Sequence, residues 1–398
     1  MRTTSGTGVL PVLDVRGATS ATYAAFGGSG FAFASWASRI PQVRDGLRLQ
    51  PSRLGLVLLA IAAGSLLALP LSGAVIARVG SRRTVRAMAV LLGAGLTTIG
   101  IGYRYGLVPV VVGLFLLGFA NGAWDVAMNV QGAVVERHLG RSIMSRFHAG
   151  YSLGTVAGAL VGAAMVALHV PVTAHLAAVA VLVVVVVPRS AGRFLPDEEP
   201  LPVGATKARE GRATALSAWG EPRTLLIGLF VLAFAFAEGA GNDWLSVAVI
   251  DGYHLPAAVG TLGLAAFLAA MTVGRWTGPA LLDRHGRVPV VRAMALLGVV
   301  GVLVFVFAPD PPLALVGALL WGVGVSLGFP VGMSAGADDP SRAAARVSVV
   351  ASIGYCAFLG GPPLVGLLGD RVSVLRALSA VAVLLGLALA VAGSVRQR

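Results

Sequence analysis

Long apolar stretches, separated by short polar segments, make up most of this 398-residue chain. A helix needs about 20 mainly apolar residues to cross a bilayer core of roughly 30 Å. Twelve stretches meet this requirement and are predicted to be transmembrane helices. They are residues 17–38, 54–77, 84–103, 107–136, 147–168, 171–188, 223–249, 257–281, 288–308, 311–335, 345–368 and 373–394. The pattern predicts an all-α polytopic membrane protein.

The composition agrees with this prediction and the charges orient it. Hydrophobic residues make up 57% of the chain and charged residues 12%, whereas about a quarter of a soluble domain is charged. The net charge of +13 would suggest nucleic-acid binding in a soluble protein. With a cytoplasmic N-terminus, however, 22 of the 30 Lys and Arg residues fall in cytoplasmic loops and termini. We therefore expect both termini in the cytoplasm and no nucleic-acid partner.

Four arginines are exceptions to this charge distribution. Arg39, Arg44, Arg48 and Arg53 fall in the first outside loop, close to Asp45.

A long polar connection, residues 188–223, divides the chain into two parts. We expect an N-terminal six-helix bundle over residues 1–188, a cytoplasmic linker over 189–222 and a C-terminal six-helix bundle over 223–398. Shifting the sequence by 206 residues superimposes the second and eighth spans, and the segment VRAMA then occurs at the same place in both copies. The chain is therefore predicted to be a duplicated, pseudo-symmetric bundle, a class of transporter with its binding site at the repeat interface.

The loops that follow these two spans carry a motif. GAVIARVGSRR at residues 73–83 and PALLDRHGR at 279–287 resemble the G-x-x-x-D-R-x-G-R-[RK] signature of the major facilitator superfamily. In that family the loop helps to latch the inside-closed state. The gating residues that the resemblance implies are Arg78, Gly80, Arg82, Asp283, Arg284, Gly286 and Arg287. Because Ala77 replaces the aspartate of the first copy, a charge latch is better supported in the second. The alternative role of these arginines is to set topology alone.

An aspartate and two asparagines lie within the fourth span. Burying a charge at the bilayer centre costs at least about 2.5 kcal/mol, so Asp125 needs a partner or a function. Asn121, Asp125 and Asn129 follow one another at intervals of four and form one stripe of the helix, with Trp124 on the same side. The stripe is predicted to line a solute cavity, where Asp125 binds a proton or pairs with a cation. The alternative is a polar contact that holds helices together.

The seventh span has a second stripe, in which Phe234, Glu238 and Asn242 are spaced by four. Glu238 lies close to the predicted membrane centre. Asp243 lies on another face and nearer the outside, where with Asn242 it is expected to line an exit or cap a broken helix. In the fifth span Tyr151 is a further candidate for binding the solute.

Glycines recur at every fourth position of the fifth span, from residue 150 to residue 162. This spacing predicts a face for close helix packing.

The segment WDVAMN, residues 124–129, looks like the E-x-x-x-N segment in the fourth helix of fucose permease and its relatives. That resemblance implies proton-coupled sugar uptake, with Asp125 in the position of the acid. Two departures are the absence of an acid from the first span and Val130 in place of a proline. GAWDVAMN, FHAGYSLG and GNDW together look closer to a bacterial subgroup whose substrates the sequence does not define. The expected location is the bacterial cytoplasmic membrane.

These observations predict a monomeric secondary transporter that moves a small solute by alternating access, coupled to protons, possible substrates being sugars or polyols. An alternative is proton-antiport efflux of drugs or metabolites. A remote alternative is an intramembrane serine hydrolase, because GGSG at residues 27–30 contains Ser29; no histidine lies deep in a later span to act as its base. We expect no enzymatic activity, no cofactor and no metal site, and the sequence has no nucleotide-binding loop.

Overall fold

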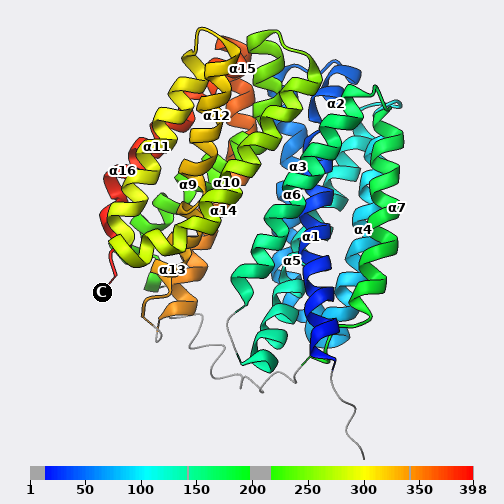
Figure 1. The fold of residues 1–398 in the computed structure, drawn as a ribbon, viewed down its shortest axis with the longest axis vertical. Coiled ribbons are helices and arrows are strands. Elements are labelled where there is room, and N and C mark those ends of the chain that lie inside the picture. Colours follow the sequence, from blue (N-terminus) through cyan, green and yellow to red (C-terminus); the bar gives the residue numbers. More distant parts are fainter. Residues whose placement is uncertain (1–13, 141–142, 198–216, 340–341, 398) are drawn as a thin grey trace, which may run out of the picture.

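The computed structural model describes residues 14–140, 143–197, 217–339 and 342–397. All regular structure in these residues is helical (Figure 1). The N-terminal half contains α1 (Val15–Ala37), α2 (Ile40–Gly46), α3 (Pro51–Val79), α4 (Ser81–Gly102), α5 (Leu107–Leu139), α6 (Met144–Ala167) and α7 (Val172–Ala191). The C-terminal half contains α9 (Pro222–Tyr253), α10 (Ala257–His285), α11 (Arg287–Phe307), α12 (Pro311–Val325), α13 (Gly328–Gly336), α14 (Ala343–Val372), α15 (Val374–Ala377), α16 (Ser379–Val391) and the 3₁₀ turn η1 (Ala392–Val395).

Each of the twelve predicted spans coincides with one helix or with a run of two or three consecutive helical elements. Among the described residues, eleven helical segments are long and apolar enough to cross a membrane. The segment that falls short is α1, which is rich in glycine, serine and threonine. Since α1 packs against α5, α6 and α7, many of its small residues are buried between helices. The sequence did not predict α2 or the break between α12 and α13.

Helix starts follow local chemistry. Asp14 precedes α1 and accepts a hydrogen bond of 2.8 Å from the backbone N–H of Gly17. Asp310 caps α12 in the same way, with 2.9 Å to the N–H of Leu313. Pro51 and Pro222 occupy the first positions of α3 and α9, where a missing N–H costs no helical hydrogen bond.

The two halves lie side by side (Figure 1). Within the N-terminal half α4 packs on α5 and α7, and α3 on α5; within the C-terminal half α9 packs on α10, α14 and α16. Contacts between the halves are made chiefly by α3 with α14, by α6 with α10 and by α2 with α9. One end of the bundle carries α2 and α15, which we call the α2 end; the other carries the end of α7 and the start of α9, which we call the linker end.

The predicted repeat is visible in backbone geometry. Gly80 and Gly286, which are 206 positions apart, have φ angles of 85° and 79°, values that only glycine adopts readily. Each donates its N–H over 2.8 Å to the carbonyl four residues earlier, that of Ile76 or Leu282. The two motif loops therefore share one sharp turn.

The glycine face predicted in the fifth span is confirmed. Gly154 packs on the backbone of Gly27, and Gly158 packs on the backbone of Phe31, both in α1. The absence of side chains lets α1 and α6 approach at backbone distance.

Replacing Gly158 by alanine places a methyl group against the Phe31 carbonyl. We expect a loss of about 1–3 kcal/mol, because the two helices must separate. A lower melting temperature of the purified protein in detergent measures this loss. Gly73→Ala is the matched control, since nothing lies within 4 Å of its added methyl group. Equal melting temperatures for the two variants would contradict the close packing.

Candidate functional site

Polar side chains from both halves gather between the two helix bundles. Tyr151 of α6 lies close enough to Asp125 of α5, and to Glu238 and Arg275 of α9 and α10, for electrostatic interaction with all three. Tyr355 of α14 interacts in the same way with Asp125. We call these five residues the central polar site.

Asp125 is half-buried and has neutral hydrogen-bonding partners only, within the described residues. The side-chain amide of Asn129 donates to its carboxylate over 3.3 Å and to its backbone carbonyl over 2.9 Å. The Asn129 oxygen lies 3.0 Å from Nε2 of His148 in α6. The predicted stripe thus joins α5 to α6, and no basic side chain in the described part of the chain contacts the Asp125 carboxylate.

Asn121 is the first residue of this stripe along α5, and it accepts a hydrogen bond of 2.9 Å from Ser29 in α1. Ser29 is 1% exposed, so its hydroxyl is packed between helices. The arrangement contains no histidine next to Ser29 in the described part of the chain, and the hydrolase alternative has no structural basis.

Glu238 has a basic partner, which the sequence did not identify. Arg275 of α10 donates to its carboxylate over 2.8 Å, and both side chains are partly exposed, 26% for Arg275 and 20% for Glu238. The only sequence signal for this pair was the position of Arg275 inside a predicted span. Glu238 and Asp125 therefore differ in charge environment: one carboxylate is neutralised and the other is not.

The remaining predicted site residues fall into two groups. Trp124 and Phe234 are completely buried: Trp124 lies beside Gly28 of α1, and Phe234 packs on Phe230 with ring centres 4.8 Å apart. In this conformation both side chains are packed between helices. Asn242 and Asp243, in contrast, are half-buried in α9.

Polar contacts between the halves are concentrated at the α2 end. Arg44 of α2 binds both carboxylate oxygens of Asp251 in α9, one of them over 3.0 Å. The N–H of Ser52 in α3 donates to Asp370 of α14 over 3.2 Å. We call the Arg44–Asp251 ion pair the α2-end latch. This ion pair gives a structural role to Arg44, one of the four arginines in the predicted first outside loop.

Comparison with known proteins identifies the family. Residues 17–361 match the model of the Major Facilitator Superfamily. The chain belongs to the major facilitator superfamily. It is a membrane transporter of that family and not an enzyme, as the motif loops predicted.

Two relatives cover most of this major facilitator chain. It is 30% identical to the uncharacterized transporter y4wD of Sinorhizobium fredii, over 87% of this chain and 89% of that one. It is 29% identical to an uncharacterized MFS-type transporter of Yersinia pestis, over 94% of both.

Two solved structures share the fold. The nucleoside transporter NupG superimposes with a TM-score of 0.74 at 12% identity, over 95% of this chain and 98% of that one. The fucose:proton symporter FucP of E. coli superimposes with a TM-score of 0.61 at 15% identity, over 94% and 98%.

The motif loops of this facilitator lie at the linker end. In the N-terminal half Arg82 donates to the carbonyl of Phe194, and Asp197 accepts from the N–H and the hydroxyl of Ser81, each over 2.5 Å. The segment after α7 therefore binds the first motif loop. This is the copy of the motif in which Ala77 replaces the aspartate of the family signature.

In the C-terminal half the second motif loop makes an ion pair through Arg287. Asp283 and Arg284 are exposed and make no hydrogen bond or ion pair with the described residues. Arg287 instead binds Asp338 over 2.6 Å, and Arg223 binds the same carboxylate over 3.1 Å. Arg78 of the first loop is also exposed.

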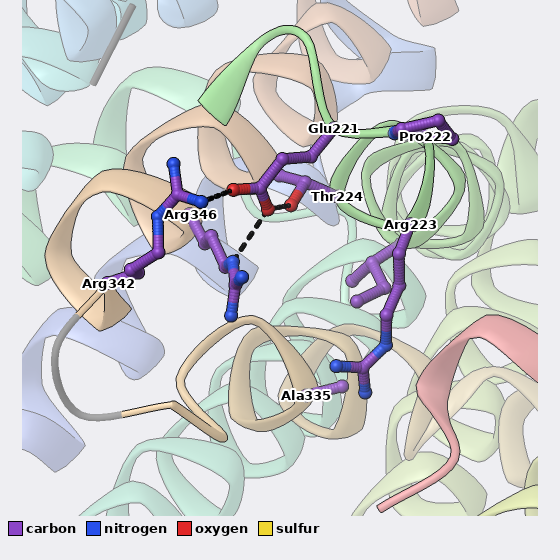
Figure 2. Close-up of a pocket in the computed structure, with 8 residues that line it drawn as sticks. Glu221, Pro222, Arg223, Thr224, Ala335, Arg342 and Arg346 are labelled. Atoms are coloured by element: carbon purple, nitrogen blue, oxygen red, sulfur yellow. Dashed lines mark hydrogen bonds and ion pairs between the residues drawn. The ribbon is translucent and has the colours of Figure 1, made fainter. Parts of the chain in front are cut away.

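A hollow of about 300 Å³ lies beside the ion pairs of Asp338, between the first turns of α9 and α14. Figure 2 shows Glu221 reaching toward Arg342 and Arg346, at 2.5 and 2.7 Å. Burial alone would raise the pKa of Glu221, but hydrogen bonds from Arg346 and Thr224 outweigh it and hold that pKa below its usual value. The hollow is therefore lined by paired charges that fasten α14 to α9.

Removing one partner of the Glu238–Arg275 pair should be more harmful than removing both. Arg275→Gln leaves a carboxylate at membrane depth without its cation, and we expect a loss of about 1–3 kcal/mol. The double variant Glu238→Gln/Arg275→Gln should recover most of it. Thermal unfolding of the purified variants measures the difference; a double variant as unstable as Arg275→Gln would show that the pair is unimportant for stability.

Proposed function

We propose that this transporter carries a small hydrophilic solute together with protons, that the solute binds at the central polar site, and that Asp125 carries the proton. The observation that carries the proposal is the environment of Asp125. It lies between the two halves, is half-buried, and contacts only neutral groups in the described residues.

Charge explains the choice of Asp125 over Glu238. An ionised carboxylate at membrane depth is costly unless a cation or a proton neutralises it. Arg275 neutralises Glu238 at 2.8 Å, so that pair can remain charged through a transport cycle. Asp125 has no such partner among the described residues, so binding a proton is the simplest way for it to become neutral when the site closes.

The same site offers hydrogen-bonding groups to a solute. Tyr151 and Tyr355 come from α6 and α14, Asp125 and Glu238 add acceptors on the two sides, and Asn129 lies beside the site as the partner of Asp125. Amides, phenols and carboxylates match the hydroxyl groups of a sugar, polyol or nucleoside. These contacts, drawn from both halves, support a solute that bridges them and moves with their rocking.

We further propose that the linker end faces the cytoplasm and that this conformation is open there. The latch and the Ser52–Asp370 bond join the halves at the α2 end. At the linker end, the hydrogen bonds of Arg82 and Arg287 each stay within one half. Both motif loops carry the basic residues expected of cytoplasmic loops.

Efflux of a cationic drug is the second candidate, because an unpaired Asp125 can also bind a positively charged substrate. The two functions differ in phenotype. If overexpression raises the tolerance of cells to lipophilic cations, efflux is favoured; unchanged tolerance favours uptake of a neutral hydrophilic solute.

Asp125→Asn should abolish proton-driven accumulation while leaving solute exchange intact, because the amide keeps the hydrogen bonds but binds no proton. The solute is selected beforehand as the compound that most raises the melting temperature in a screen of nucleosides, hexoses, polyols, organic acids and lipophilic cations. Uptake into proteoliposomes is then measured with and without a pH gradient. Asp310→Asn, which alters an exposed helix cap where asparagine serves equally, is the control. Undiminished gradient-driven uptake by Asp125→Asn would refute the role of Asp125.

Breaking the latch should open the α2 end. Arg44→Gln removes an ion pair worth about 1 kcal/mol, which corresponds to a roughly fivefold shift in the ratio of open to closed molecules. Distances between spin labels on Gln50→Cys and His254→Cys, in a Cys356→Ser background, report this ratio. Arg48→Gln changes a neighbouring exposed arginine and should leave the ratio as it is; identical distance distributions for both arginine variants would contradict the latch.

A further inference from the structure

A second acid within the spans, Asp243 of α9, has no part in the proton cycle proposed above. It stands beside Asn242, and Ser246 follows one turn later. With about 100° of rotation per residue, positions 242, 243 and 246 fall within one third of the helix circumference. Three side chains that carry oxygen therefore lie on adjoining parts of the α9 surface, with Asn242 on the Glu238 stripe and Asp243 about 100° from it. We call them the α9 oxygen cluster.

The oxygens of this cluster have no partners among the described residues. Oδ1 of Asn242 is buried and unbonded, and so is Oγ of Ser246. Ser246 is only 4% exposed. Asp243 is half-buried and makes neither a hydrogen bond nor an ion pair within the described part of the chain. Buried polar atoms in native proteins nearly always have a partner, which can be an ion or water.

Ser246 differs in this respect from other buried hydroxyl groups in the spans. Thr22, Ser72 and Thr272 are equally enclosed, and each donates to the carbonyl one turn earlier, over 2.6–2.8 Å. That local bond is the usual solution for a serine or threonine in an apolar helix. The hydroxyl of Ser246 is unbonded instead, so its oxygen is available to a ligand.

The neighbouring helix α14 packs against α9 and contains carbonyls that lack a helical donor. Gly239 precedes Ser246 by about two turns and lies on the same side of α9. A methyl group added to Gly239 would meet the ring of Phe358 in α14 at 3.5 Å. Pro362 and Pro363 lie inside α14 and have no N–H. The carbonyls of Phe358 and Leu359 therefore lack the donor that a regular helix would supply.

We propose that the α9 oxygen cluster binds an alkali-metal cation, Na⁺ in the cell, as a second coupling ion. Hard cations take oxygen ligands, and Na⁺ sites in transporters combine side chains with carbonyls freed from helical bonding. One carboxylate balances the single charge, and the amide and hydroxyl oxygens replace hydration. The described residues contain no group of three or more His, Cys, Asp or Glu that could hold a metal ion, which separates this site from one for a transition metal.

The inference rests on the proposed function, because a coupling ion presupposes a transporter, but the binding step can be measured without any solute. The melting temperature of the purified protein is recorded against increasing NaCl, with choline chloride replacing NaCl to keep ionic strength constant. A second series uses KCl. A cation that binds the folded state raises the melting temperature in a saturable way.

Wild type should show a saturable Na⁺-dependent rise that KCl and choline chloride do not reproduce. Asp243→Asn should abolish it, and Ser246→Ala should weaken the apparent Na⁺ affinity about tenfold, as expected for a disturbed metal site. Ser72→Ala is the matched control, since Ser72 is buried and already bonded to a carbonyl; it should respond to Na⁺ as wild type does.

Equal melting temperatures in NaCl and choline chloride for wild type would overturn the inference, and so would an undiminished Na⁺ response in Asp243→Asn. The first of these results, combined with proton-driven uptake that depends on Asp125, would leave the proposed function in place. A saturable Na⁺ response in a protein whose uptake ignores the pH gradient would instead support the cation site and refute proton coupling.

Discussion

The free-energy cost of burying a charged side chain among apolar membrane helices is the main constraint on this structure. Every ionisable side chain at membrane depth needs a counter-charge, a proton or a bound ion. Arg275 supplies a counter-charge for Glu238 at 2.8 Å. Asp125 and Asp243 have none among the described residues, and this difference separates a fixed ion pair from two sites that can exchange ligands. The proposed functions of both acids follow from that contrast.

The same constraint acts differently at the two ends of the bundle. At the α2 end a buried arginine, Arg44, finds its carboxylate on the opposite half, so charge pairing couples the halves. At the linker end Arg287 and Arg223 find theirs, Asp338, within their own half. An ion pair that crosses the interface resists separation, whereas one inside a half does not. This distribution of pairs supports the proposed opening at the linker end.

Local periodicity predicted much of the fold. Apolar length placed all twelve spans, and glycine spacing placed the contact of α6 with α1, because both signals lie within single helices. Ion pairs between different helices could not be predicted in this way. Glu238 and Arg275 are 37 residues apart, and no local sequence pattern links them. Trp124 and Phe234 share a face with polar residues, yet packing against neighbouring helices buries them. The motif gave no signal for the pair of Arg287 with Asp338, because Asp338 lies 51 residues further along the chain, after the end of α13.

The most direct measurement of the central proposal is infrared difference spectroscopy of the purified protein as the pH is lowered, carried out in saturating NaCl. A protonated carboxylic acid in an apolar setting gives a carbonyl band distinct from those of carboxylates and amides. We expect such a band to form on acidification in wild type and Asp243→Asn, and to be missing from Asp125→Asn. A band that persists unchanged in Asp125→Asn would contradict the proposal that Asp125 carries the proton.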